Sequence, residues 1–136
     1  MENTNYLYSG LSNKILKAFY KVYNTLGYGF LEKVYENAMM IELQNMGLKC
    51  RQQQHIDVYY KEEKVGDYFA DIVVEDTIII ELKAAEGIIE EHEAQLVNYL
   101  RATDMEVGLL LNFGKTPQHR RKVLTEEYKK YSRKKH

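Results

Sequence analysis

Cysteine, proline and tryptophan are scarce in this sequence, whose 136 residues include one cysteine, one proline and no tryptophan. The single cysteine, Cys50, cannot form an internal disulfide, which excludes the small disulfide-stapled folds. Neither Cys50 nor His55 has the closely spaced partner that a structural zinc site requires. No apolar run approaches the roughly 20 residues of a membrane-spanning helix, and no signal-peptide pattern opens the chain. These absences predict a cytoplasmic protein without a membrane partner.

Length and composition are those of a single globular domain. The chain is 45% hydrophobic and 29% charged, which excludes a disordered chain. The net charge of −1 is unevenly distributed, because eight lysines and arginines face only two acidic residues from residue 119 onward. We therefore expect one domain at residues 1–118 and a basic C-terminal tail at residues 119–136. The tail, with Arg120, Arg121 and Lys122 at its start, suits attraction to nucleic acid, although it also fits a solvated terminus.

Two amphipathic helices are predicted near the N-terminus. Apolar residues recur at spacings of three and four from Ser9 to Leu26, and the glycines of the segment 27–29 end that helix. A second helix is predicted from about Leu31 to Met46. The residues expected on its buried side are Val34, Ala38, Ile41 and Leu43. The two helices are expected to form a hairpin with a glycine-rich elbow.

Three strands are predicted between residues 48 and 83. Polar and apolar residues alternate from Leu48 to Tyr60 and again from Val65 to Val74, and each stretch ends in a polar turn. The segment from Thr77 to Lys83 begins as a continuous run of β-branched apolar residues. Such a run predicts a strand buried on both faces, and therefore a central place in the sheet.

The remaining elements complete an α/β fold. A helix is predicted from Glu90 to Arg101, a fourth strand from Val107 to Leu111, and a weak final helix after the sole proline, Pro117. The order ααβββαβ plus a C-terminal helix predicts a mixed four-stranded β-sheet flanked by helices. The helix between the third and fourth strands permits a parallel crossover.

An acid and an acid–lysine pair stand in the predicted second and third strands. Asp71 precedes Glu81 by ten residues, and Lys83 lies two residues beyond Glu81, so Glu81 and Lys83 leave the same face of their strand. Hard divalent cations such as magnesium prefer carboxylate oxygens, water and phosphate oxygens. We therefore expect Asp71 and Glu81 to hold a metal, with the backbone carbonyl of Leu82 as a further ligand. Lys83 would orient or deprotonate a water molecule, or stabilise developing negative charge.

This metal site imposes a condition on the turn between the two strands. A two-residue turn at Glu75 and Asp76 would place Asp71 opposite Ile80, and the two carboxylates would lie on opposite faces of the sheet. A three-residue turn would place Asp71 directly opposite Glu81. The site therefore requires an odd-length turn or a bulge at this point.

Asp71 followed by Glu81-Leu82-Lys83 resembles the D…(D/E)-x-K signature of the PD-(D/E)XK nuclease superfamily. Residues 29–35 read G-x-x-E-x-x-Y, the motif of the GxxExxY protein family, and residues 92–100 and 112–114 resemble later blocks of that family. The resemblance covers about residues 10–115. It implies a restriction-endonuclease-like core and a nuclease that uses Mg²⁺ or Mn²⁺. One departure is Ala70, which stands where the superfamily often has proline.

The resemblance also implies supporting residues. Glu32, on an early helix, matches an acid that leans into the metal site of such nucleases, directly or through water. Gln95 and Tyr99 are spaced like the Q-x-x-x-Y element of RecB-like nucleases, which contacts metal ligands or the DNA backbone. His92 lies near that helix face and is a candidate for proton transfer or phosphate contact, or else a structural residue. Tyr35 lies on the helix face of Glu32 and is expected either to support the site or to pack in the core.

The sequence thus predicts a metal-dependent nuclease that hydrolyses phosphodiester bonds, with DNA favoured over RNA. The alternative is a non-catalytic module on the same fold that binds nucleic acid or assembles with a protein. The chain has little room for a separate DNA-recognition domain, which favours a homodimer or a partner subunit. Metal-dependent stabilisation through the carboxylates distinguishes the two functions.

Overall fold

The computed structural model describes residues 7–129. Its helices and strands follow in the order α1 (Ser9–Leu26), α2 (Glu32–Asn45), β1 (Cys50–Tyr60), β2 (Glu63–Val74), β3 (Ile78–Lys83), α3 (Glu90–Arg101), β4 (Val107–Phe113) and β5 (Pro117–Val123). A single 3₁₀ turn, Glu126–Tyr128, comes last. No helix in the described part of the chain has the length and hydrophobicity needed to cross a bilayer.

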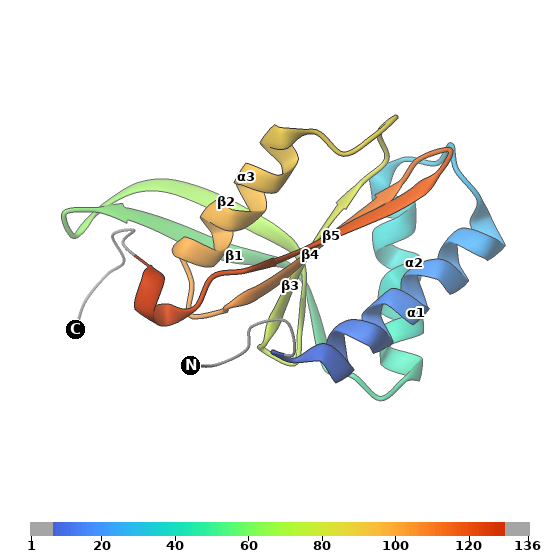
Figure 1. The fold of residues 1–136 in the computed structure, drawn as a ribbon, viewed down its shortest axis with the longest axis horizontal. Coiled ribbons are helices and arrows are strands. Elements are labelled where there is room, and N and C mark those ends of the chain that lie inside the picture. Colours follow the sequence, from blue (N-terminus) through green and yellow to red (C-terminus); the bar gives the residue numbers. More distant parts are fainter. Residues whose placement is uncertain (1–6, 130–136) are drawn as a thin grey trace.

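The five strands form one mixed sheet in the order β1-β2-β3-β4-β5. Only the pairing of β3 with β4 is parallel, and α3 makes the crossover between them, as expected. The helices α1 and α2 lie together on one side of the sheet, α3 lies on the other, and the β1–β2 hairpin extends away from α1 and α2 (Figure 1). The predicted α/β fold, with a mixed sheet flanked by helices, is confirmed, although the sheet has a fifth strand.

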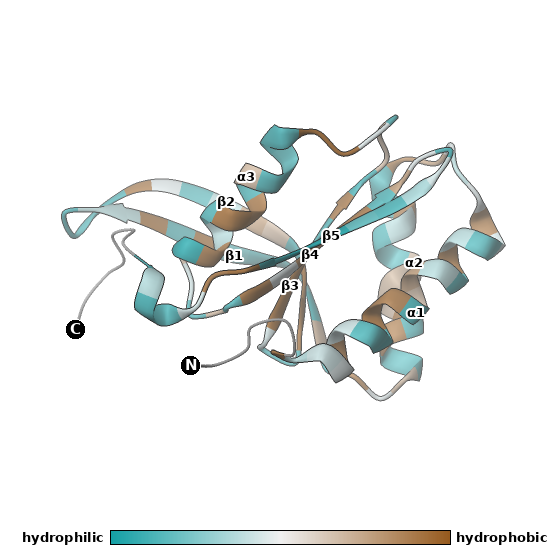
Figure 2. Ribbon diagram, in the orientation of Figure 1, coloured by the Kyte–Doolittle hydropathy of each residue, from teal (hydrophilic) through white to brown (hydrophobic). Residues whose placement is uncertain are grey.

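The central strand β3 is buried on both faces, as its sequence predicts. Ile78, Ile80 and Leu82 belong to the core beneath α1 and α2, whereas Ile79 belongs to a second core beneath α3. The strands β3 and β4 form the hydrophobic centre of the sheet, and the distal part of the hairpin is more polar (Figure 2). The side chain of Glu81 is therefore carried into the interior by a strand that is apolar on both faces.

Helix α2 buries only part of the predicted face: Leu43 is fully buried and Ala38 packs against the core, as predicted, but the helix is rotated away from the other two residues. Val34 is 39% exposed and Ile41 is 58% exposed, whereas Tyr35 and Met39 are fully buried. The reason is the packing of the Tyr35 ring, which stacks on Phe113 of β4 with ring centroids 4.2 Å apart. A large aromatic ring buries more apolar area than a valine, so it sets the rotation of the helix.

The C-terminal helix predicted after Pro117 is wrong, because this segment forms the edge strand β5, antiparallel to β4. Proline is tolerated as the first residue of an edge strand, where its missing N–H costs no ladder bond. Residues 119–123 consequently lie in the sheet, where a basic tail was expected to begin. The tail residues Lys130, Arg133, Lys134 and Lys135 lie outside the described residues.

A close backbone contact joins the ends of β3 and β4. The side-chain amide of Asn112 accepts a hydrogen bond from the Ala85 N–H at 2.9 Å and donates one to the Ala85 carbonyl at 3.0 Å. A Cβ atom on Gly114 would lie 2.4 Å from that same carbonyl oxygen. The connection after β3 is therefore held directly against the β4–β5 turn.

Replacing Gly114 with alanine should destabilise the protein by about 1–3 kcal/mol, because the added methyl group would force the two segments apart. The matched control is Gly10→Ala in α1, where a Cβ meets nothing within 4 Å. Alanine there should be neutral or stabilising by up to about 1 kcal/mol. Urea unfolding of both variants measures the difference, and equal stabilities would contradict the close contact.

Candidate active site

The β2–β3 turn meets the condition set by the sequence. Val74 pairs with Ile78 and Ile72 pairs with Ile80, which leaves a three-residue connection, 75–77. The first two residues of this connection, Glu75 and Asp76, have φ angles of 53° and 51°, the left-handed conformation that a tight turn requires. Continued by one residue, this register brings Asp71 opposite Glu81.

Asp71 and Glu81 each bind the backbone of the other's strand. The Asp71 N–H donates to Oε2 of Glu81 at 2.9 Å, and the Leu82 N–H donates to Oδ2 of Asp71 at 2.8 Å. The backbone ladder between β2 and β3 ends one residue earlier, at Ile72 and Ile80. Carboxylate oxygens thus replace carbonyl oxygens as acceptors, and these two bonds hold each acid in a defined orientation.

Burial makes the charged form of this pair costly. Glu81 is only 5% exposed. Burial, followed by the nearby charge of Asp71, raises the pKa of Glu81 to about 8. Burial also raises the pKa of Asp71, against the opposing effect of its bond from Leu82. Two carboxyl groups held together, one of them nearly excluded from solvent, are a site that a cation would stabilise.

Lys83 is the positive charge next to the pair. It follows Glu81 on the same face of β3 and is partly buried, and its charge opposes the rise in the pKa of Glu81. Leu82 points its side chain into the core beneath α1 and α2. Because the N–H and C=O of a strand residue point to the same side, the Leu82 carbonyl is directed toward β2 and Asp71.

Helix α2 contributes two acids. Glu32, in its first turn, is exposed, and its charge contributes to raising the pKa of both Asp71 and Glu81. Glu36 follows one helical turn later and is only 4% exposed. It acts more strongly than Glu32 on the pKa of Asp71. Sequence reasoning selected Glu32 and missed Glu36.

A polar network connects Glu36 to Asp71. Gln53 donates from Nε2 to Glu36 at 2.9 Å and to Oδ1 of Asp71 at 3.3 Å. Gln52 and Lys33 bind the other oxygen of Glu36 at 2.7 and 2.9 Å. Gln53 has a φ of 51°, within β1, so the strand is irregular at the point where it reaches the acids. The run of three glutamines at 52–54 was the available signal, but it also fits an ordinary polar strand.

Helix α3 brings the predicted pair Gln95 and Tyr99 together. Nε2 of Gln95 donates to the Tyr99 hydroxyl at 2.8 Å, and the tyrosine is 5% exposed. Burial, followed by the charge of Glu81, raises the pKa of Tyr99 to about 12. The tyrosine hydroxyl therefore stays protonated close to the acids and remains a hydrogen-bond donor.

The other two predicted supporting residues have structural contacts. His92 accepts a hydrogen bond at Nδ1 from the Ile89 N–H at 3.2 Å, which caps the start of α3. Tyr35 is fully buried, and its hydroxyl donates to the Gly27 carbonyl at 2.7 Å and accepts from the Phe30 N–H at 3.2 Å. Of the two roles left open for Tyr35, packing in the core is the one observed.

The three basic residues proposed for nucleic-acid binding do not share a face. Lys122 pairs with Glu93 of α3 at 2.6 Å, and Arg120 approaches the same carboxylate at 3.9 Å. Arg121 projects to the opposite face of β5, where it binds the Leu7 carbonyl. Their contacts connect the edge strand β5 to α3 on one face and to the segment before α1 on the other.

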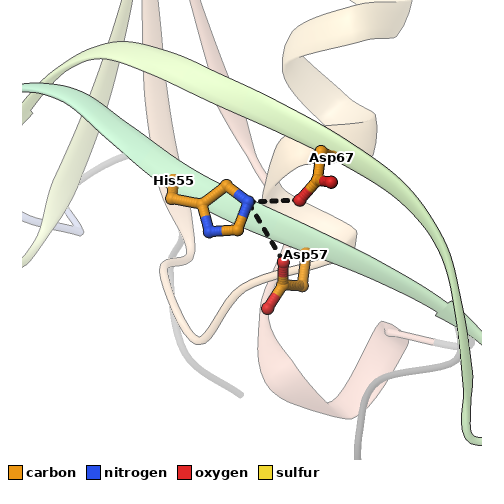
Figure 3. Close-up of side chains that lie close together, drawn as sticks. All are labelled: His55, Asp57 and Asp67. Atoms are coloured by element: carbon orange, nitrogen blue, oxygen red, sulfur yellow. Dashed lines mark hydrogen bonds and ion pairs between the residues drawn. The ribbon is translucent and has the colours of Figure 1, made fainter.

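A second group of potential ligands lies on the β1–β2 hairpin (Figure 3). His55, Asp57 and Asp67 each offer an atom within 4.8 Å of the others. Lys64 already binds both acids, at 3.1 Å from Asp57 and 2.8 Å from Asp67. Its hydrogen bond, with that of His55, lowers the pKa of Asp67 to about 2. The charges of this exposed group are thus compensated within the protein, unlike those of Asp71 and Glu81.

Comparisons with known proteins bear on the fold and on the family of this chain. The crystal structure of SSO0001 superposes with a TM-score of 0.55 at 15% sequence identity, over 68% of this chain and 50% of that chain. At this identity the likeness concerns the fold alone, and this chain spans half the length of that protein. A search of curated proteins gave no match. The family model of the PD-(D/E)XK nuclease superfamily matches residues 9–123, from the start of α1 to the end of β5. The match includes every residue of the acid–lysine site, although it does not test the GxxExxY assignment. Because this match covers most of the chain, the chain belongs to the PD-(D/E)XK nuclease superfamily.

Proposed function

We propose that this protein is a metal-dependent nuclease that hydrolyses phosphodiester bonds at the site formed by Asp71, Glu81 and Lys83. The observation that carries the proposal is the reciprocally bonded carboxylate pair, in which Glu81 is nearly excluded from solvent. A buried acid pair of this kind is unfavourable by itself and is suited to bind a hard divalent cation.

The donor set fits Mg²⁺ or Mn²⁺. Asp71 and Glu81 would hold the ion, with the Leu82 carbonyl directed toward the same place. Glu32 would take part directly or through water, and Glu36 would add negative charge through the network that reaches Asp71. When bound, the ion supplies a more acidic water and neutralises charge on the scissile phosphate.

The other residues act around the reacting phosphate. The Lys83 ammonium would orient the attacking water or stabilise the developing negative charge. Tyr99, positioned by Gln95, would donate a hydrogen bond toward the acids or the phosphate. Arg120 and Lys122 would add salt-dependent attraction for the polyanion along β5. His92, at the start of α3, would contact phosphate or take part in proton transfer there.

Cleavage of labelled single- and double-stranded DNA and RNA, in manganese, magnesium or EDTA, tests the activity directly. We expect cleavage that requires the metal and disappears in EDTA. Cleavage at the same rate in EDTA would contradict the proposal, because hydrolysis would then proceed without a bound divalent ion.

Manganese should stabilise the folded protein through Asp71. At roughly a hundred times the dissociation constant, binding contributes about 2.7 kcal/mol, or a melting-temperature increase of about 10 °C for a domain of this size. The increase should vanish in Asp71→Asn, whose side chain still accepts the bond from Leu82. Thermal melts with increasing manganese measure both.

The matched control is Asp67→Asn, which removes an acid from the hairpin group of His55, Asp57 and Asp67. This variant should keep the full manganese response. If Asp67→Asn loses the response and Asp71→Asn keeps it, the metal binds at the hairpin and the proposed site is wrong.

A further inference from the structure

A pocket opens next to Glu32, the exposed acid whose charge acts on Asp71 and Glu81. It has a volume of about 500 Å³, and its walls include Tyr28, Phe30, Glu32, Ala84 and Lys115. Glu32 belongs to both the pocket and the acidic site, and Ala84 is the residue that follows Lys83. Glu32 and the backbone of residues 83–84 are the links on which a chain bound at Lys83 would reach this pocket.

One wall is the loop between α1 and α2. Gly27 and Gly29 have φ angles of 69° and 110°, which only glycine adopts without strain. The buried Tyr35 hydroxyl fastens this loop at both ends, through the Gly27 carbonyl and the Phe30 N–H. The conformation of the loop is thus set by the interior of the protein.

This loop nevertheless presents large apolar side chains to solvent. Tyr28 is 56% exposed, Phe30 is 47% exposed and Leu31 is 81% exposed. Exposed aromatic rings on a fixed loop at the edge of a cavity are typical of a surface that binds another ring or an apolar group. The Phe30 ring meets the buried Tyr35 ring edge-on, with centroids 6.1 Å apart, and about half of its surface stays open to solvent.

The opposite wall, formed by residues 84–86 and 113–115, is fixed by side-chain hydrogen bonds to its backbone. Asn112 binds both backbone groups of Ala85. The Tyr23 hydroxyl lies 2.8 Å from the Gly114 carbonyl and 2.7 Å from the Lys115 carbonyl, so it ties the β4–β5 turn to α1. The pocket is therefore preformed, which reduces the entropic cost of binding.

The charges at the pocket disfavour an anion and admit a neutral ring. Two carboxylates, Glu32 and Glu86, line it against one ammonium, Lys115. A phosphate group entering the pocket would meet this excess of negative charge. A nucleobase is planar and uncharged, stacks on aromatic side chains, and is attached to the phosphate that Lys83 would contact.

We propose that this pocket binds an unpaired nucleobase beside the scissile phosphate, so that the substrate is single-stranded nucleic acid or an unpaired end or flap. The inference rests on the proposed nuclease function for the position of the phosphate. A base within a duplex is stacked on both faces and must leave the stack before it enters such a pocket. Fully paired nucleic acid is therefore a poor substrate.

Binding of oligonucleotides that contain 2-aminopurine, whose fluorescence falls on stacking, tests this inference. The measurement uses full-length Lys83→Ala protein with manganese, so that the strand is bound without being cut. We expect quenching with a single strand and not with a duplex. The double variant Tyr28→Ala/Phe30→Ala should lose the quenching and bind the single strand about tenfold or more weakly.

The matched control is Tyr60→Ala, which removes an aromatic ring that is 61% exposed on the distant end of the hairpin. It should leave quenching and affinity unchanged. Because the substituted loop residues are exposed, the double variant should melt within a few degrees of the parent protein, and melting curves verify that it is folded.

The outcomes separate this inference from the nuclease proposal. Quenching that depends on Tyr28 and Phe30, without cleavage by the wild-type protein, would support the pocket and contradict the nuclease. Metal-dependent cleavage that is insensitive to the double variant and to an abasic site at the scissile position would overturn the pocket alone. Equal binding of single strand and duplex, or no binding, would also overturn it. A double variant that alters only self-association would assign the loop to a protein contact instead.

Discussion

Lys83→Ala is expected to reduce metal-dependent cleavage by about a hundred- to ten-thousandfold, the range for loss of a positioned proton-transfer or charge-stabilising group. The physical reason is its place on β3. Lys83 leaves the same face as Glu81, and its charge already acts on that carboxyl group. No other lysine is attached to the rigid central strand beside the acids. Single-turnover cleavage of a labelled oligonucleotide in manganese measures the effect.

The matched control for this substitution is Lys64→Ala. Lys64 also pairs with two acids, Asp57 and Asp67, but on the exposed β1–β2 hairpin. Its removal should leave the cleavage rate within about twofold, since exposed ion pairs contribute little. If Lys83→Ala cleaves as fast as the wild-type protein, or if Lys64→Ala is the inactive variant, the assignment of Lys83 is wrong.

Glu81→Gln is expected to stabilise the metal-free protein at alkaline pH. Burial raises the folded-state pKa of Glu81 from 4.5 to about 8, so folding favours the protonated acid. The stability that this group contributes is complete below pH 4.5 and is lost as the pH rises through about 8. Glutamine stays neutral at every pH and still offers an oxygen to the Asp71 N–H. The variant should therefore gain on the order of a few kcal/mol over the wild-type protein at pH 9.

Urea unfolding in EDTA at pH 5 and pH 9 tests this expectation. The advantage of Glu81→Gln should be small at pH 5 and large at pH 9, because the wild-type carboxyl group is protonated at the lower pH. Glu62→Gln, at an exposed position in the β1–β2 turn, serves as the control and should show little change at either pH. An equal gain for Glu81→Gln at both pH values would show that its effect does not come from the charge.

In manganese the wild-type protein should be more stable to unfolding than Glu81→Gln, the reverse of the order expected in EDTA at pH 9. The wild-type protein then gains binding energy at the acid pair, and the variant has lost one of the two carboxylate ligands. An acid pair that destabilises the empty protein and stabilises the loaded one is typical of a functional site, where residues serve chemistry at the expense of stability.

The sequence predicted that Asp71 and Glu81 lie together because their relation is local. Asp71 and Glu81 are joined by a short antiparallel connection, so their relation depends only on the parity of one turn. Gln95 and Tyr99 are four residues apart on a helix, and their hydrogen bond follows from that spacing. In both cases backbone periodicity alone brings the groups together.

The parts that sequence reasoning missed depend on contacts between distant segments. Glu36 is buried because α2 packs against the irregular point of β1, where Gln53 bridges it to Asp71. The basic residues of β5 were predicted to belong to a tail, because their own sequence has no strong strand pattern. They form a strand by pairing with the edge of β4, which exists only once the sheet has formed. Val34 and Ile41 are exposed because the rotation of α2 directs Tyr35 into the core. That rotation depends on Phe113, the stacking partner of Tyr35, which is distant in the chain.

The sequence by itself determined the order of the main elements, the buried central strand, and the acid–lysine pattern that the strand carries. Hydrophobic periodicity and turn chemistry are properties of neighbouring residues, so they can be read without the fold. Only the tertiary structure decided which helix face is buried, that β5 forms the edge of the sheet, and that a pocket with aromatic walls lies next to Glu32. These features depend on competition among distant side chains for the same space, and packing settles that competition only when the whole chain has folded.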